Sequence, residues 1–176
     1  MAIKKTIAII EATGEREAFI AKRLSNAYRL LLIGAEKVEL HQLAEGLKEA
    51  NNNTEVEVIE CAREACWEAD IIITPYPLQK EVIQRIKEVS VGKVVVCISR
   101  SKDAGENLQH FLPYSRVAIL TMAANQKLAY GNITCLVKTT DDEALETVAA
   151  LLGAIGSSPV ISEEADKQYT LQNMEG

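Results

Sequence analysis

The sequence is poor in the residues that most metal-binding and catalytic motifs require. Its 176 residues include only two histidines and four cysteines. Cys61 and Cys66 lie five positions apart and no second pair with metal-ligand spacing accompanies them, so we expect no metal site. His41 and His110 fall in helical patterns and are expected at the surface. The sequence contains no Ser-His-Asp order, paired-acid motif or P-loop.

Long hydrophobic runs and clusters of positive charge are absent too. The longest apolar runs, such as 30–33 and 71–73, have the length of a strand and are far too short to cross a bilayer. The net charge is −6 at pH 7 and no aromatic-basic stripe occurs, which argues against nucleic acid as a partner. Residues 1–5 lead straight into the first predicted strand and leave no room for a signal peptide. We therefore expect a cytoplasmic protein with no membrane partner.

Strand and helix patterns alternate along almost the whole chain. Hydrophobic residues make up 48% of it, which is enough for a full core. The predicted strands are 5–10, 29–34, 55–59, 70–74, 93–99, 116–121, 132–138 and 159–161. The predicted helices are 14–26, 36–50, 61–68, 78–89, 104–112, 142–152 and 163–174, with 122–129 as a further candidate. This alternation predicts a three-layer, doubly wound α/β fold: a mostly parallel sheet of about eight strands with helices on both faces. Without a repeat or a linker, we interpret 1–176 as a single domain.

The turn after the first strand is the most informative segment. The apolar strand 6–10 runs through 11–17 into a helical pattern, as a nucleotide-binding βαβ unit does. Such a turn normally carries three glycines, so that backbone N–H groups can approach a pyrophosphate closely. Only Gly14 is present here. In the spacing G-x-x-G-x-x-G, the two flanking glycine positions are Glu11 and Glu17.

These acids can be interpreted in two ways. At ~5 Å and an effective dielectric of ~20, a carboxylate repels a phosphate charge by about 3 kcal/mol. A repulsion of that size weakens binding by a factor of roughly a hundred in Kd. Arg16 could offset part of it by binding a phosphate, or could pair with Glu11 or Glu17 instead. Alternatively, Glu15 and Glu17 are ordinary first-turn acids that face water and are stabilised by the helix dipole. Glu11 ends a buried strand, so we regard it as the better sign of an altered function.

A second segment, 34–37, follows the second predicted strand. An acid at this place commonly holds the ribose 2′-hydroxyl of NAD, whereas an arginine accommodates the 2′-phosphate of NADP. Glu36 would disfavour that phosphate, although Lys37 adjoins it. Glu36 could equally well cap the helix that follows.

The chain carries an ordered set of further motifs, at 9–14, 21–24, 32–34, 66–73, 92–96, 108–117, 141–145 and 170–174. Together they resemble the NADP oxidoreductases that depend on coenzyme F-420, a deazaflavin, over essentially the whole chain. The resemblance implies a Rossmann fold that binds NADP or NAD. It also implies hydride transfer between that cofactor and a deazaflavin or another small acceptor, in a homodimer.

The resemblance also assigns site residues. It places the pyrophosphate turn at Thr13, Gly14, Glu15 and Arg16, and the adenosine ribose at Ala35 and Glu36. The nicotinamide side would be lined by Thr74, Pro75, Tyr76 and Pro77, with Met122 and Ala123 opposite. The sequence departs from the family where Glu11 and Glu17 replace glycines and where Ala35-Glu36 replaces Ser-Arg. Relatives continue beyond position 176 with more helix, so the C-terminal helix is expected to be short.

Three functions are consistent with these patterns. The first is an NAD(P)-dependent oxidoreductase of the deazaflavin-dependent type. The second is a non-catalytic relative with lost or weakened dinucleotide binding, which acts as a ligand-binding or interaction domain. The third is an unrelated nucleotide or sugar-phosphate binder that uses Arg16, Arg100 and Lys102 as anion contacts. The turn at 11–17 separates the first from the second.

Overall fold

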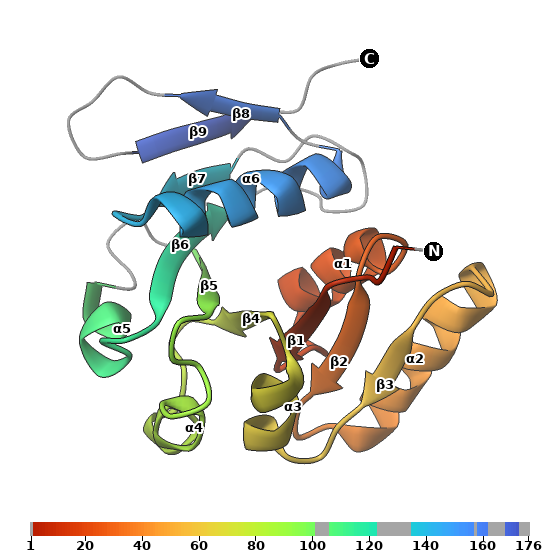
Figure 1. Ribbon diagram of the computed structural model, residues 1–176. Helices are drawn as coiled ribbons and strands as arrows, with labels where there is room; N and C mark the ends of the chain where they lie inside the picture. The colour runs from red at the N-terminus through yellow and green to blue at the C-terminus, as the bar shows by residue number, and fades with distance from the viewer. Residues whose placement is uncertain (1, 101–105, 123–134, 157, 162–167, 173–176) are drawn as a thin grey trace.

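A single mixed sheet organises the described part of the chain (Figure 1). The computed structural model describes residues 2–100, 106–122, 135–156, 158–161 and 168–172. Within these ranges nine strands lie in the order β3-β2-β1-β4-β5-β6-β7-β9-β8. The strands are β1 Thr6–Ile10, β2 Arg29–Ile33, β3 Val56–Val58, β4 Ile71–Pro75, β5 Val94–Ser99, β6 Arg116–Met122, β7 Cys135–Lys138, β8 Ser158–Ile161 and β9 Gln168–Gln172. The helices are α1 Glu15–Leu24, α2 Lys37–Ala50, α3 Ala62–Glu68, α4 Lys80–Ile86, α5 Glu106–Phe111 and α6 Asp142–Ile155.

The six strands from β3 to β6 in this order pair in parallel, and the remaining three are antiparallel. This arrangement confirms the predicted doubly wound α/β fold. The helix predicted over 163–174 is wrong over 168–172, which form the strand β9 between β7 and β8, and the rest of that range lies outside the described residues. The polar residues of this segment suggested a surface helix. Tyr169 and Thr170 nevertheless favour a strand, and two neighbouring strands supply its backbone partners.

Helices cover both faces of the sheet because alternate strand residues point to opposite sides. Ile7 and Ile9 of β1 belong to a core cluster with residues of α1, α2 and α6. Ala8 and Ile10 belong to a second cluster with residues of α3, α4 and α5. Both clusters consist largely of side chains with almost no exposed surface. The result is three layers, with one helical layer on each side of the strands.

Several element boundaries differ from the predictions. Met122 ends β6 rather than opening a helix, and 123–134 lie outside the described residues. Helix α6 continues through Gly153 to Ile155 and is capped by Gly156, whose φ of 93° is the left-handed conformation that glycine adopts readily. As predicted, Cys97 and Cys135 are buried. Among the described residues, none of the helices combines the length and the apolar character that a membrane-spanning helix needs.

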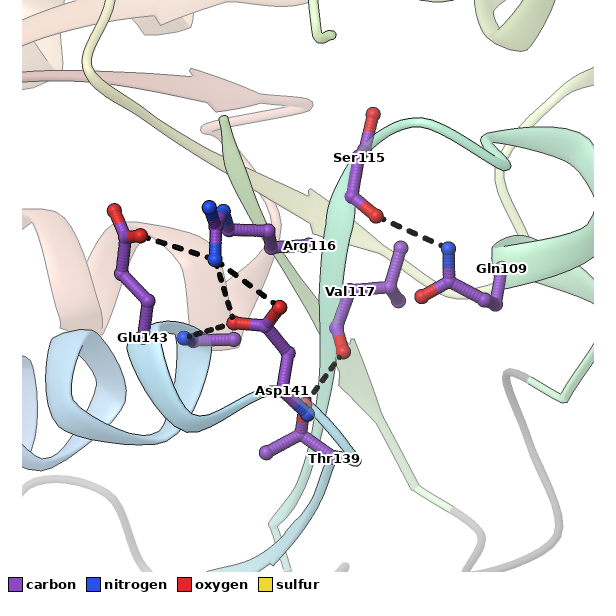
Figure 2. A network of polar contacts seen from close by, with 8 residues as sticks. Gln109, Ser115, Arg116, Val117, Thr139, Asp141 and Glu143 are labelled. Carbon is purple, nitrogen blue, oxygen red and sulfur yellow. Dashed lines mark hydrogen bonds and ion pairs between the residues drawn. The ribbon is translucent and has the colours of Figure 1, made fainter. Parts of the chain in front are cut away.

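A polar network fixes the start of α6 above β6 (Figure 2). Asp141 Oδ1 accepts a hydrogen bond from the Ala144 backbone N–H at 2.9 Å, which caps the helix. Arg116 Nη1 lies 3.2 Å from Asp141 Oδ2 and 3.0 Å from Glu143 Oε2. Thr139 Oγ1 donates to the carbonyl oxygen of Val117 at 2.9 Å. These contacts join the loop before α6 to the first residues of β6, and thereby position the helix over β5 and β6.

We expect Asp141→Ala to lower the free energy of unfolding by about 1–2 kcal/mol, the usual cost of losing an N-cap. The Ala144 N–H bond and, to a smaller degree, Arg116 hold the pKa of Asp141 below its ordinary value. Its contribution is therefore present above the unfolded pKa and is lost as pH falls through the folded one. Urea unfolding at pH 7 and pH 3 measures both effects. Glu146→Ala, an exposed change in the same helix, is the control and should leave stability nearly unchanged.

Candidate functional site

The strand order reverses at β1, and a cavity lies at this point of the sheet. From β1 the chain builds outward to β2 and β3, and then returns to β4 on the other side of β1. Ligands of doubly wound sheets bind beyond the carboxyl ends of the strands at such a switch point. Here a cavity of about 380 Å³ is formed by the start of α1, the end of β4 and the end of β5. Its lining residues are Gly14, Glu15, Arg16, Glu17, Pro75, Tyr76, Pro77, Ile98 and Arg100.

The turn between β1 and α1 contains one residue in a backbone conformation that glycine favours. Glu11 has a φ of +53°, in the left-handed region that glycine favours. The Gly14 N–H donates to the Glu11 carbonyl oxygen at 3.0 Å, and the Ala12 N–H donates to Ile33 O of β2 at 3.0 Å. These bonds close the turn and tie it to the neighbouring strand. The side chain of Glu11 is exposed.

Glu17, by contrast, is buried. Only 7% of its surface is exposed, because it lies on the stripe of α1 that faces the sheet together with Ile20, Ala21 and Leu24. The interpretation of Glu17 as an acid facing water is therefore wrong. Glu15 and Glu17 both enter the cavity lining, whereas Glu11 does not, so Glu17 joins Glu11 as a sign of an altered site. The spacing 17, 20, 21, 24 was the sequence signal for this burial.

The carboxylate of Glu17 turns back onto Gly14, at the amino end of α1. A Cβ atom added to Gly14 would collide with Glu17 Oε2, so the missing side chain is what makes room for the carboxylate. Its own backbone N–H donates a hydrogen bond to it. In a nucleotide-binding turn, the space that this glycine leaves open is where the backbone approaches a pyrophosphate. In this chain a carboxylate of the protein occupies that space.

The surroundings of Glu17 act on its charge in opposite directions. Burial, the largest effect, raises the pKa of Glu17, and the charge of Glu11 raises it further. The backbone N–H, Arg16 and Arg100 lower it. On β5, burial raises the pKa of the Cys97 thiol to about 12, with a smaller contribution from Glu17. The buried carboxylate thus lies within the electrostatic reach of two arginines, which favour its charge, while the core disfavours it.

Arg16 brings a buried hydrogen-bond donor to the cavity. Its Nε atom is buried and has no hydrogen-bond partner among the residues that the structure describes. Arg100, at the end of β5, contributes a second, exposed guanidinium group to the same cavity. Guanidinium groups bind carboxylates and phosphates through charge-assisted hydrogen bonds. The cavity therefore offers two cationic groups that can bind an anion, next to two acidic residues, Glu15 and Glu17.

The cavity contains half of the residues assigned from the resemblance. Gly14, Glu15, Arg16, Pro75, Tyr76 and Pro77 all line it. Thr13 is half-buried and Thr74 is fully buried, and neither is part of the lining. The Thr74 hydroxyl lies 3.2 Å from the Pro75 carbonyl oxygen, to which it donates. The resemblance assigned no role to Glu17, Ile98 or Arg100, which also line the cavity. Arg16 and Arg100 are two of the anion contacts named in the third hypothesis, and Lys102, the other contact, lies outside the described residues.

The remaining assigned residues lie apart from this cavity. Glu36 is exposed at the N-cap of α2 and makes no side-chain capping bond, so the capping interpretation is not observed. Lys37, which follows Glu36 in the sequence, forms an ion pair with Glu60: its Nζ lies 2.7 Å from Glu60 Oε1. Ala35 directly precedes Glu36 in the sequence. Met122 is buried in the apolar core beneath α6. Ala123 lies outside the described residues.

A larger hollow, of about 740 Å³, lies between the last turn of α1 and α2. It is remote from the carboxyl ends of the strands. Lys22 is its only charged lining residue, and the Asn51 side-chain amide donates to Asn26 Oδ1 at 2.8 Å. This hollow offers neither an acid–base pair nor a cluster of cations, so we place the candidate site in the smaller cavity.

No family model matches the sequence, and no curated protein matches it. Solved structures do match the fold. An imine reductase from Myxococcus stipitatus in complex with NADP+ superimposes with a TM-score of 0.66 at 16% identity, over 85% of this chain and 52% of that protein. For pyrroline carboxylate reductase of Plasmodium falciparum with NADP bound, the TM-score is 0.63 at 14% identity, over 87% of this chain and 55% of that protein. For a protein of Arthrobacter sp. described as an F-420-dependent NADP reductase, the TM-score is 0.60 at 14% identity, over 87% of this chain and 81% of that protein.

These identities establish the fold alone. The chain spans about half the length of the first two proteins, and most of the length of the third. All three are reductases by description, with NADP in the name or in the complex.

Proposed function

We propose that this chain is the dinucleotide-binding domain of an NAD(P)-dependent oxidoreductase. The observation that carries the proposal is the cavity at the strand-order reversal, where the unpartnered Nε of Arg16 and the guanidinium group of Arg100 lie beside the amino end of α1. That is the place at which doubly wound sheets hold a coenzyme diphosphate. The structural neighbours that carry NADP at a related fold support it.

The residues fit a diphosphate with one exception. Gly14 leaves the open backbone that a phosphate needs, and two arginines supply positive charge. The exception is the Glu17 carboxylate, which lies against Gly14. A phosphate cannot take the place of this group; it can bind beside it only if the carboxyl shifts or loses its charge.

In the proposed complex, Arg16 and Arg100 would hold the phosphate charges. Pro75, Tyr76 and Pro77, at the end of β4, would line the path toward the nicotinamide. The bound nicotinamide would supply the hydride chemistry, and the protein would supply position and electrostatics. The finer proposal, from the sequence resemblance, is that a deazaflavin is the hydride partner in a cytoplasmic homodimer. The Arthrobacter protein, most of whose length is matched, supports the deazaflavin partner.

The second candidate is a non-catalytic relative of such enzymes. The position of the Glu17 carboxylate favours it, because a protein that never binds a phosphate can keep its own anion at this place. Coenzyme binding separates the two candidates directly.

We expect millimolar NADH or NADPH to raise the melting temperature by several degrees. A ligand present at a hundred times its Kd adds about 2.7 kcal/mol to stability. Arg16→Gln should remove most of the shift, because it deletes the buried donor and its charge. Arg23→Gln, an exposed change at the other end of the same helix, is the matched control and should keep it. If neither coenzyme shifts the wild-type transition at any pH between 5 and 8, the oxidoreductase proposal is wrong and the second candidate stands.

A further inference from the structure

We infer that Glu17 couples ligand binding to proton uptake: the coenzyme binds when the Glu17 carboxyl is neutral, and this carboxyl then donates a hydrogen bond to a phosphate oxygen. The inference rests on the proposed function and adds to it a proton that must enter with the ligand. Three features of Glu17 support the inference: its position, the groups that surround it and the routes by which its side chain could reach solvent.

The helix face keeps Glu17 inside. It shares the sheet-facing stripe of α1 with Ile20, Ala21 and Leu24, and these neighbours are buried and apolar. Below the carboxylate lies the core, and beside it Ile98 lines the cavity wall. The open side is the cavity itself, which the ligand would fill. A bound phosphate therefore closes the route by which the side chain could reach solvent.

An ionised carboxylate and a phosphate repel each other strongly when they lie side by side in this cavity. At ~5 Å and an effective dielectric of ~20, their repulsion is about 3 kcal/mol. A proton removes the repulsion and turns the carboxyl into a hydrogen-bond donor toward the phosphate. Neutral acids in apolar sites are known to act as such donors. Protonation of Glu17 is thus the change that requires the least rearrangement of the fold.

The groups around Glu17 are consistent with this mechanism. Arg16 from α1 and Arg100 from the end of β5 favour the ionised form, while Glu11 from the β1 turn and burial disfavour it. Cys97 of β5 remains a neutral thiol, because burial raises its pKa to about 12. Glu15 and Tyr76 complete the titratable groups of the cavity lining. When the phosphates arrive they bind the arginines, so the two groups that stabilise the Glu17 anion become engaged elsewhere.

The sign of the pH effect follows from this exchange. In the free protein, burial already raises the pKa of Glu17. A bound phosphate would raise it further, so the complex holds more protons than the free protein. Between the free and the bound pKa, Kd should rise by up to tenfold for each pH unit. Affinity is therefore expected to be highest in mild acid and to fall toward alkaline pH.

Isothermal calorimetry with NAD+ between pH 5 and 8 tests the inference. NAD+ is the suitable probe because a phosphate monoester, such as the 2′-phosphate of NADP+, itself titrates at about pH 6. We expect Kd of the wild type to rise at least tenfold over this range. Titrations at one pH in two buffers of different ionisation enthalpy should show proton uptake that approaches one proton per ligand at the steepest point. This measurement needs no variant.

Glu17→Gln is the decisive variant, since it keeps the shape of the side chain and removes its titration. It should bind NAD+ with a Kd that no longer depends on pH. Glu39→Gln is the matched control, because Glu39 is the third residue of α2 as Glu17 is of α1, but is exposed. It should retain the wild-type pH dependence.

Three results would overturn the inference, and they differ in what they imply for the proposed function. Binding of NAD+ with a pH-independent Kd, or with proton release, contradicts the role of Glu17 and leaves the proposed function intact. Release would mean that the side chain leaves the cavity and ionises in solvent. Absence of binding by the wild type and by Glu17→Gln at every pH refutes the proposed function together with the inference.

Discussion

Replacement of both Glu11 and Glu17 by glycine is expected to tighten the binding of NADH by up to about a hundredfold at neutral pH. The upper limit is the charge repulsion of about 3 kcal/mol between an ionised carboxylate and a phosphate at close range, and proton uptake by Glu17 in the wild type makes the gain smaller. Most of it should come from Glu17, because its carboxylate lies against Gly14 and is shielded from water. The side chain of Glu11 is exposed, so solvent and salt screen its charge.

Glycine suits the backbone at both positions. At position 11 it adopts the positive φ without the strain that a side chain adds there. At position 17 it opens the space above Gly14, although a glycine within a helix costs about 1 kcal/mol of stability. Calorimetric titration of the double and single variants measures the affinities. Glu39→Gly, at the equivalent position of α2, is the control and should bind like the wild type. An unchanged Kd in the double variant would contradict our account of the turn.

The second large effect concerns stability. We expect Ile9→Ala to lower the free energy of unfolding by about 3–4 kcal/mol, because it removes buried carbon atoms and leaves a cavity. Ile9 has no exposed surface and pairs in register with Leu32 of β2 and Ile73 of β4, both of which are buried. Since β1 is held on both sides, the strands cannot move inward to fill the space.

Urea or thermal unfolding measures this effect, and a fall in the melting temperature of roughly 10 °C is expected. Ile3→Ala is a well-matched control, because it removes the same atoms from a side chain that is 98% exposed. It should change stability by less than about 0.5 kcal/mol. Should Ile9→Ala prove too unstable to purify, Ile9→Val should still lose about 0.5–1.5 kcal/mol. Equal stabilities of Ile9→Ala and Ile3→Ala would mean that β1 is not at the centre of the core.

The sequence predicted the parallel part of the fold well because buried parallel strands leave a strong pattern. Continuous aliphatic runs such as 30–33 and 94–96 are what a strand covered on both faces requires. The segment 168–172 was mistaken for a helix, because the partners of an antiparallel edge lie far away in the sequence. Local residue preferences do not contain that information.

The site was predictable only in part, for a related reason. The location of the nucleotide-type turn followed from a strand, a glycine and a helix in the expected order. The helical spacing of Glu17 to Ile20 and Leu24 implied its burial, but its place in the first turn of a helix favoured the interpretation as an acid that faces water. The third hypothesis already paired Arg100 with Arg16 as anion contacts, and the position of β5 two strands from β1 brings both to the same cavity.

The left-handed backbone of Glu11 has a consequence at the level of the gene. Glutamate and glycine codons differ only in their middle base, so a single transition at that base converts either glutamate of the turn to glycine. The loop at position 11 already has the dihedral angle that glycine prefers. A mutational route from this turn to a glycine-rich one therefore needs no insertion, no deletion and no altered path of the main chain.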